Sequence, residues 1–583
     1  MSEGGTDRGN RVRPSDPALG SAEDPLQRLR DGLARRRGWL FAGLAALYLA
    51  SFTGQWRIGE DSALYLTLAR SLAEGEGYRF GGEWHRFGFP GLPRLLSPLY
   101  RLFGEAAPDA ATWLMLPLAG LTLAGVYRLF RLHAGTGVAT AMVLGLGVCE
   151  NFYRYAFQVR NDVPYLLGIV AVLAGYEGLR RGREEGGRPA VDWAMVAGGM
   201  ALLTCMRPVM LVFHAAVLAA CAWGVARGPK RVMHAVLAAL SVATMVVFFV
   251  ADPRRETAPA PSPAPAAVVA NVDNAGPSNA VETPAAGEDQ AAPRYESKLF
   301  DKLERLPDTL SRGLGHWAKL TWGGLLSEAV LGIELGLGVL DAAFAAALLI
   351  AGLLLAKKRP LWGLFVAANV GQMLLFPPIE RYVLPMIPLL LYAGWELLRW
   401  ASHRLREDQA KWLVAGVVIL AVGPNLGLDV ALIAEQRAAD TYARQGGGRF
   451  ARVPAMVDAV EAHVPPGAVL ISDEVRVLTL LTRRTGCTSG EAMRDWRAGE
   501  GEGDGEGQGE DARWHPPHGE VWAALRIPPT AAQRSLLEQA GVRVIGEAAV
   551  VEPDADAARD AADAGEKLPT RERGWRLVRL AFE

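Results

Sequence analysis

The sequence predicts a mainly α-helical, polytopic membrane domain followed by a small C-terminal α/β domain. Half of the 583 residues are hydrophobic, and they gather in long runs that are separated by short charged loops. About eleven of these runs are long enough for membrane-spanning helices. After the last run the pattern changes to short amphipathic helices and apolar strands separated by Pro and Gly, which is typical of a soluble α/β unit.

The charge and cysteine content exclude some classes of function. The 61 basic and 62 acidic side chains give a net charge of −1, so the chain is not a globally basic nucleic-acid-binding protein. The four cysteines are scattered and have neither CxxC nor metal-ligand spacing. A disulfide framework is therefore not expected.

The membrane domain is expected to follow a polar leader. Residues 1–37 contain a Gly-, Asp-, Ser- and Pro-rich segment and then three arginines, and we expect them to form a disordered cytoplasmic leader. A first group of transmembrane helices then occupies residues 38–251, interrupted by a first outer loop at 54–112. The apolar runs of this group lie at 38–53, 113–130, 135–149, 163–179, 191–206, 208–226 and 232–251.

A linker separates this group of helices from a second one. Residues 252–294 are rich in Pro and Ala and cannot pack a core, so we expect a disordered outer loop. Residues 295–431 are expected to hold a helix along the membrane surface at 295–320 and then further spans. The apolar runs of these spans lie at 335–356, 360–377, 382–399 and 412–430.

The C-terminal part, residues 440–583, is predicted to be the α/β domain. Apolar periodicity and turn residues indicate helices and strands in alternation. We expect helices at 454–463, 474–482 and about 530–540, and strands at 468–472, 542–545 and 575–581. An acidic, Gly-rich stretch at 498–512 is expected to be a disordered insertion, with metal binding as the less favoured interpretation.

The distribution of Lys and Arg predicts the orientation of the chain. Positive charges concentrate in alternate short loops, on the side of the N-terminus. This pattern predicts a bacterial-type inner-membrane protein with a cytoplasmic N-terminus and an extracytoplasmic C-terminal domain. Four arginines in short outer loops oppose the usual bias and are therefore candidates for function: Arg154, Arg160, Arg207 and Arg381.

The first outer loop starts with an acidic helix. Glu60 and Asp61 follow the first apolar run, and apolar residues then recur at helical spacing as far as Gly75. Asp61 or Ser62 is expected to cap this helix. A capped interfacial helix explains the segment as structure, and it leaves open whether the carboxylates also do chemistry.

Two further polar groups stand at outer helix ends. Arg160 and Asp162 precede one apolar run, while Arg381 and Tyr382 open another. Each group alone is explained by helix capping or by anchoring at the membrane interface. Because both groups are expected on the same side of the membrane as Asp61, a shared site is favoured.

These residue types suit transfer from a lipid-linked phosphate donor. Guanidinium groups bind phosphate oxygens in bidentate fashion, a role open to the four outer arginines. An acceptor hydroxyl or amine that attacks a sugar needs a carboxylate to take its proton, and Asp61 is the candidate, with Asp162 or Glu60 as its partner. Alternatively, Asp61 and Asp162 hold a divalent metal ion that neutralises the leaving phosphate.

Three motifs carry a family resemblance. They are D-x-x-x-Y-x-x-x-A-x-x-L-x-x-G from Asp61 to Gly75, R-x-D-x-P from Arg160 to Pro164, and R-Y-x-x-P-x-x-P from Arg381 to Pro388. In order and spacing they resemble the GT-C membrane glycosyltransferases, with the protein O-mannosyltransferase and aminoarabinose-transferase group as the nearest relatives. The resemblance covers most of residues 38–430. It implies a sugar donor on polyprenyl phosphate, an active site on the extracytoplasmic face, and an aspartate in the first outer loop as catalytic base.

The resemblance also marks candidate substrate contacts and one departure. Relatives often carry two adjacent acids of the type Asp-Glu where this chain has Glu60-Asp61, so either acid is a candidate for the base. His85 and Arg86 lie in a segment that lines the donor or acceptor site in such proteins. The candidate substrate contacts are Tyr65, His85, Arg86 and Tyr382.

The sequence thus predicts a membrane glycosyltransferase that moves a hexose or pentose from a polyprenyl-phosphate donor to an extracytoplasmic lipid, glycan or protein. The rival hypothesis is a polytopic transporter or flippase for a lipid-linked or anionic substrate. That class is typified by paired repeats and by charges near the membrane midplane, and no convincing internal repeat is visible here. A non-catalytic relative whose membrane helices only anchor the C-terminal domain is the third alternative.

Overall fold

The computed structural model describes most of the two predicted helical groups and parts of the C-terminal domain. The described residues are 25–80, 83–85, 90–182, 188–207, 209–227, 230–250, 339–355, 359–375, 380–438, 453–465, 468–472, 475–483, 485–487, 521–526, 542–551 and 575–582. Several predictions lie outside these residues. They are the Pro/Ala-rich loop at 252–294, the surface helix at 295–320, the acidic insertion at 498–512 and the helix near 530–540.

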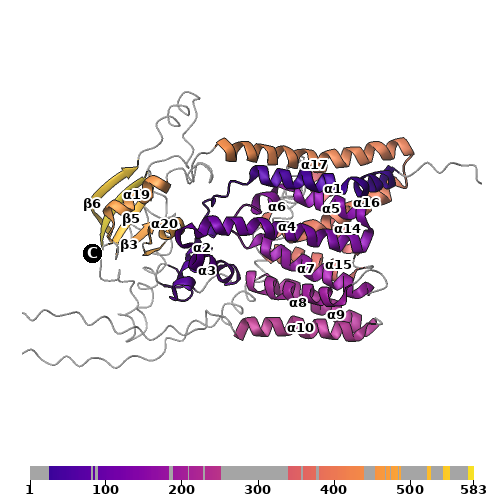
Figure 1. Ribbon diagram of the computed structural model, residues 1–583, viewed down its shortest axis with the longest axis horizontal. Coiled ribbons are helices and arrows are strands. Elements are labelled where there is room, and N and C mark those ends of the chain that lie inside the picture. Colours follow the sequence, from indigo (N-terminus) through magenta and orange to yellow (C-terminus); the bar gives the residue numbers. More distant parts are fainter. Residues whose placement is uncertain are drawn as a thin grey trace, which may run out of the picture.

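Long helices lying side by side form the larger part of the molecule (Figure 1). Their bounds are α1 (Pro25–Ser51), α4 (Ala107–Ala134), α5 (Thr136–Gly147), α7 (Asp162–Arg181), α8 (Pro189–Met206), α9 (Met210–Arg227), α10 (Arg231–Val250), α14 (Val339–Leu354), α15 (Pro360–Leu375), α16 (Ile387–Ser402) and α17 (Glu407–Ala438). Five segments of the described chain are long and apolar enough to cross a membrane. They are Gly91–Ala134, Asp162–Arg181, Pro189–Met206, Arg231–Val250 and Glu407–Ala431. The chain is an integral membrane protein, and the sequence-based number of about eleven spans stays a prediction.

Helix α7 lies at the centre of this bundle. Most of its residues are buried, whereas α10 and α17 expose apolar side chains such as Val247 and Ile419. Glycines allow α7 and α8 to approach closely, because a Cβ on Gly199 would lie only 2.7 Å from the carbonyl oxygen of Gly168. The centre of the bundle is therefore fixed by backbone-to-backbone packing, and the N-terminus of α7, which carries Asp162, is held in place.

The N-terminal leader differs from the expectation. Helix α1 begins at Pro25, so residues 25–37, predicted to be disordered, are helical. Leu26 is buried, and Arg28 pairs with Glu407 of α17 at 2.6 Å. Contacts with α5 and α17 order this segment, and the composition of the leader does not reveal them.

A group of short elements covers one end of the bundle. They are α2 (Glu60–Glu74), β1 (Arg79–Phe80), β2 (Glu83–Trp84), α3 (Gly91–Phe103), η1 (Gly104–Ala106) and α6 (Glu150–Tyr155). Helix α2 ends at Gly75, as predicted, with φ +84° in the left-handed region that glycine adopts most readily. The predicted cap was wrong: Gly59 is the N-cap and Asp61 lies inside the first turn, where its side chain faces arginines instead of the helix N–H groups.

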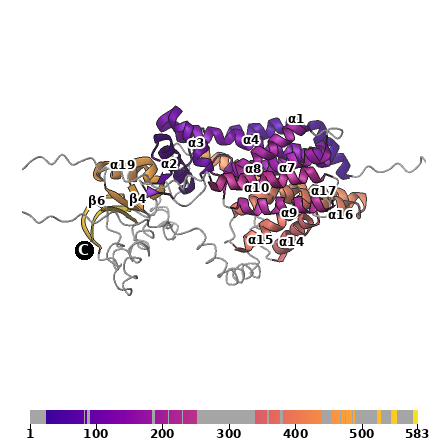
Figure 2. The same ribbon diagram turned by 90° about the horizontal axis from the view of Figure 1, so that it is seen from below.

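The described segments from residue 453 onward form a five-stranded sheet and two helices beside α2 and α3 (Figures 1 and 2). They are called the C-terminal domain below, and an α/β domain that extends over residues 440–583 stays a prediction. The described elements are α19 (Val453–His463), β3 (Val469–Ser472), α20 (Val475–Thr482), β4 (Thr485–Cys487), β5 (Val521–Arg526), β6 (Val542–Val551) and β7 (Trp575–Phe582). The strand order is β4-β3-β5-β7-β6, with β3 parallel to both β4 and β5 and with β7 antiparallel to β5 and β6. Strands β4 and β5 do not appear among the elements expected from the sequence.

Candidate functional site

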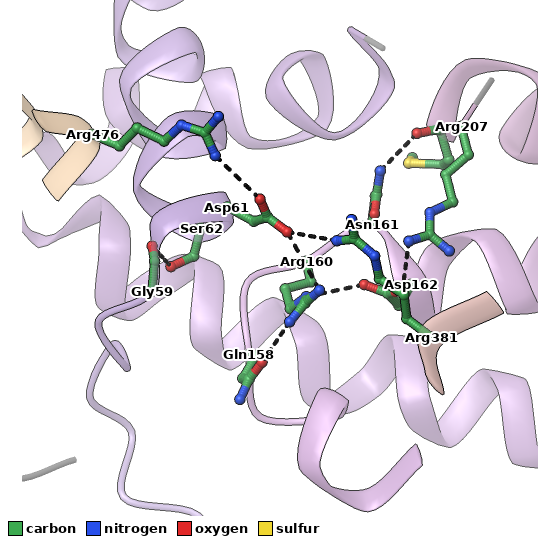
Figure 3. A network of polar contacts seen from close by, with 11 residues as sticks. Gly59, Asp61, Ser62, Gln158, Arg160, Asn161, Asp162, Arg207, Arg381 and Arg476 are labelled. Atoms are coloured by element: carbon green, nitrogen blue, oxygen red, sulfur yellow. Dashed lines mark hydrogen bonds and ion pairs between the residues drawn. The ribbon is translucent and has the colours of Figure 1, made fainter. Parts of the chain in front are cut away.

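Asp61 lies at the centre of a group of arginines where α2 meets the helix bundle (Figure 3). Its Oδ2 accepts hydrogen bonds from Nη1 of Arg381 at 2.8 Å and from Nη2 of Arg160 at 3.4 Å. Its Oδ1 accepts a hydrogen bond from Nη1 of Arg476 at 3.5 Å. The Asp61 side chain is 33% exposed, so it binds these guanidinium groups and still faces solvent.

Asp162 is the second carboxylate of the group and is fully buried. It is the first residue of α7, where a negative charge is favourable because the N-terminus of a helix carries a partial positive charge. Its Oδ2 accepts a hydrogen bond from Nε of Arg160 at 3.1 Å, and its Oδ1 lies 2.9 Å from Nη2 of Arg207 in an ion pair. Arg160 therefore bridges Asp162 and Asp61.

Aromatic rings and one amide hold these arginines in place. The guanidinium of Arg160 lies over the ring of Tyr155, 4.7 Å from its centroid. Arg207 is buried and lies 5.9 Å from the ring centroid of Tyr382. Nδ2 of Asn161 donates to the carbonyl oxygen of Met206 at 2.9 Å, which ties the start of α7 to the end of α8 beside Arg207.

The electrostatics of the group favour an anionic ligand. Asp61, Asp162, Arg160, Arg207, Arg381 and Arg476 are linked by these ion pairs, and together they carry an excess of two positive charges. Burial lowers the pKa of Arg160 and of Arg381, but in each case the neighbouring carboxylates outweigh burial and hold the pKa above its ordinary value. Both guanidinium groups therefore stay charged.

Tyr65 lies one helical turn beyond Asp61 on α2. Burial and then the carboxylate of Asp61 raise the pKa of Tyr65 to about 12. The phenol is thus protonated at neutral pH and available as a hydrogen-bond donor near the arginines. Its role as a substrate contact stays a prediction.

The structure brings together most of the predicted site residues. Asp61, Asp162 and three of the four outer arginines lie in one group, with Tyr382 beside Arg207. Arg154 does not belong to it, because this side chain pairs with Glu150 one turn earlier on α6.

Three other candidates remain: His85, Arg86 and Glu60. His85 is half-buried, with its ring 5.9 Å from that of Tyr78. Arg86 lies outside the described residues. Glu60 opens helix α2 directly before Asp61.

Sequence reasoning missed Arg476. This residue lies on α20 of the C-terminal domain, 415 positions after the aspartate that it contacts. Helix α20 was expected, but its sequence gives no sign of which side chains face the membrane domain. The C-terminal domain was expected on the same side of the membrane as Asp61, so its arginines could have been counted among the candidates for the site.

A guanidinium group lies between the two carboxylates that the metal hypothesis pairs, and that hypothesis stays a prediction. A shared ion would have to lie between Asp61 and Asp162, and the guanidinium of Arg160 occupies that position with a hydrogen bond to each. Within the described segments no three His, Cys, Asp or Glu side chains come close enough to hold a metal ion. The positive charge at this site is provided by the arginines.

Comparisons with known proteins identify the fold. No protein-family model matches the chain, and no curated protein sequence matches it. The solved structure of ArnT from Cupriavidus metallidurans bound to undecaprenyl phosphate is 13% identical, covers 93% of this chain and 98% of its own, and has a TM-score of 0.51. The same protein in the apo state is 12% identical, with 94% and 98% covered and a TM-score of 0.50. The fold predicted from the resemblance to GT-C glycosyltransferases is confirmed by this similarity, which at such low identity concerns the fold alone.

Proposed function

We propose that this protein is a membrane glycosyltransferase that moves a hexose or pentose from a polyprenyl-phosphate donor to an acceptor outside the cytoplasm. The observation that supports it best is the linkage of Asp61 through Arg160 to Asp162, with Arg207 and Arg381 on either side. These residues come from α2, from the ends of α7 and α8, and from the segment before α16. Their convergence at one end of an apolar bundle suits a donor with a charged phosphate and a hydrophobic tail.

The chemistry follows from the properties of these groups. Arg207 and Arg381 bind oxygens of the donor phosphate, for which the planar guanidinium fork is well matched. An acceptor hydroxyl or amine attacks the anomeric carbon, and the bond from that carbon to the phosphate oxygen breaks. The phosphate leaves with the bonding electron pair, and the proton of the acceptor passes to a carboxylate oxygen of Asp61.

Arg160 and Arg381 neutralise Asp61 when no donor is bound. Phosphate oxygens and the Asp61 carboxylate compete for the guanidinium groups of Arg160 and Arg381. Donor binding would draw these hydrogen bonds toward the phosphate, and it would free Asp61 to accept a hydrogen bond from the acceptor. The buried Asp162 keeps its two arginines oriented throughout.

The location of the charges favours an enzyme over a transporter. Asp162 opens α7, Arg207 directly follows α8, and Arg381 precedes α16. The group thus stands at helix ends, whereas a transporter or flippase places such charges near the midplane of the membrane. ArnT, which shares the fold, is described in complex with undecaprenyl phosphate, and this supports a donor of the same chemical class.

Substitution of Asp61 tests the proposal directly. Purified protein in proteoliposomes would receive a panel of radiolabelled sugars on undecaprenyl phosphate, together with extracted envelope lipids, glycans and proteins as acceptors. We expect Asp61→Asn to lower kcat by roughly 10²- to 10⁴-fold, the usual contribution of a general base. The matched control is Glu60→Gln, which changes the adjacent acid and should retain activity.

Each contrary outcome has a clear meaning. Full activity in Asp61→Asn together with loss in Glu60→Gln would assign the base to Glu60. Wild-type protein that moves the labelled lipid across the bilayer without releasing its sugar would instead support the flippase alternative and refute the transferase.

A further inference from the structure

The C-terminal domain contacts the outer end of the membrane domain through helix α20. Arg70 of α2 is buried and donates hydrogen bonds to the carbonyl oxygens of Leu480 at 2.9 Å and Thr479 at 3.4 Å. Arg483, just after α20, pairs with Glu105 of η1. These contacts fix the C-terminal end of α20 against the membrane domain.

The other end of α20 reaches the candidate site. Val477, Leu478 and Leu480 are buried, so the helix packs through its apolar side. Arg476 in its first turn is 38% exposed and extends toward Asp61, with Nη1 of the arginine 3.5 Å from Oδ1 of the aspartate (Figure 3). The two guanidinium groups on the opposite oxygen of Asp61 come from the membrane domain.

We propose that Arg476 is a further phosphate-binding residue of this site, so that the site is complete only when the C-terminal domain is docked. The inference rests on the proposed function, because the ligand of Arg476 is the phosphate of the lipid-linked donor. Asp61 accepts its hydrogen bond while no donor is present. When a donor is bound, the guanidinium turns from the carboxylate to a phosphate oxygen that is close by.

The charge of the site supports a specific role for this residue. Without Arg476 the linked carboxylates and guanidinium groups carry one excess positive charge, and with it they carry two. The phosphodiester that links the sugar to its lipid carries one negative charge. The phosphate monoester that leaves carries ~1.5 to 2 negative charges. The positive charge of Arg476 thus matches the negative charge that develops as the bond to the anomeric carbon breaks.

This matching predicts which kinetic constant depends on Arg476. An interaction that strengthens in the transition state raises kcat, whereas an interaction of equal strength in the ground state only lowers KM. We therefore expect Arg476→Ala to lower kcat by roughly 10- to 100-fold, the effect of one charge-assisted hydrogen bond, with KM for the donor changed by less than about threefold. Arg476→Lys keeps the charge without the planar fork, so it should recover part of the loss.

The experiment combines kinetics with a binding measurement. The variants are Arg476→Ala, Arg476→Lys and, as the matched control, Arg483→Ala, which removes an arginine from the same interface but from an exposed pair. Donor kinetics would be measured in proteoliposomes, and affinity for undecaprenyl phosphate would be measured by native mass spectrometry. We expect the affinity for undecaprenyl phosphate to fall roughly 10- to 100-fold in Arg476→Ala only. Hydrogen exchange of α20 would confirm that the domain stays docked.

The outcomes separate this inference from the proposed function. If Arg476→Ala matches Arg483→Ala in kcat and in affinity for undecaprenyl phosphate, Arg476 is a docking contact and the inference is wrong, whatever the transferase assay shows. A wild-type protein that binds undecaprenyl phosphate through Arg476 but transfers no sugar would refute the proposed reaction and leave the phosphate site in place. Loss of docking in Arg476→Ala would also overturn the inference.

Discussion

Removal of the Arg70 side chain should loosen the C-terminal domain from the membrane domain. The buried guanidinium of Arg70 donates to two carbonyl oxygens in the last turn of α20, those of Leu480 and Thr479. The Thr479 oxygen also accepts the backbone N–H of Arg483 at 3.1 Å. In Arg70→Met the apolar stem remains, so packing against α20 is largely kept while the charged donors are lost.

The geometry sets the size of the effect. The hydrogen bond to Leu480 at 2.9 Å has good geometry, and a hydrogen bond from a charged group contributes ~1.5–3 kcal/mol. The second hydrogen bond at 3.4 Å is long and adds little. A positive charge at the C-terminus of a helix adds ~0.3–1 kcal/mol. We expect a loss of about 2–4 kcal/mol, equivalent to a roughly 30- to 900-fold shift from docked to undocked protein.

Hydrogen exchange measured by mass spectrometry in nanodiscs can test this expectation. Amide protons of α20 and of the facing part of α2 should exchange roughly 30- to 900-fold faster in Arg70→Met, in proportion to the undocked population. Arg483→Ala is the control, because its ion pair with Glu105 is exposed and such pairs contribute at most ~1 kcal/mol. Unchanged exchange in Arg70→Met, or equal acceleration in both variants, would refute this account of docking.

Two further predictions concern packing and protonation. Gly199→Ala should lower the free energy of unfolding by ~1–3 kcal/mol and lower the melting temperature with it, because the added Cβ would lie 2.7 Å from the carbonyl oxygen of Gly168. A Cβ added to the neighbouring Gly198 would meet nothing within 4 Å, so Gly198→Ala should not destabilise, and equal melting temperatures of the two variants would contradict the packing argument. Tyr65→Phe should leave the alkaline limb of the pH–activity profile unchanged up to about pH 10, because burial and then Asp61 raise the pKa of Tyr65 to about 12. Loss of the alkaline limb of the pH–activity profile in Tyr65→Phe would show that the Tyr65 phenol titrates in this pH range, and it would contradict the raised pKa.

Hydropathy and charge sidedness predict that the main site residues lie on one side of the membrane, and this made a shared site the favoured hypothesis. Positive-inside bias assigned Asp61, Arg160 and Arg381 to the same membrane surface before any contact was known. Because these three residues directly follow or precede apolar runs, they were expected at the same end of the helix bundle. The structure places these side chains within hydrogen-bonding distance of one another.

Other features could not be predicted, because hydropathy does not order the helices laterally. Arg154 and Arg207 looked equivalent in the sequence, yet only Arg207 reaches Asp162. The spacing of Arg154 from Glu150 by one helical turn was a local signal for the pair that forms. The contact of Arg476 with Asp61 depends on how two domains dock, and no periodicity within either domain reports that.

The two carboxylates of the site are suited to different tasks. Asp162 is fully buried and held by two arginines, and removal of one partner from such a buried ion pair is strongly destabilising, by ~3–5 kcal/mol. Asp61 is 33% exposed, and its arginines reach it from separate elements at 2.8, 3.4 and 3.5 Å. An acceptor from solvent can approach Asp61 and cannot approach Asp162. In the proposed reaction Asp61 is thus the carboxylate that exchanges arginines for substrate, while Asp162 holds Arg160 and Arg207 in place.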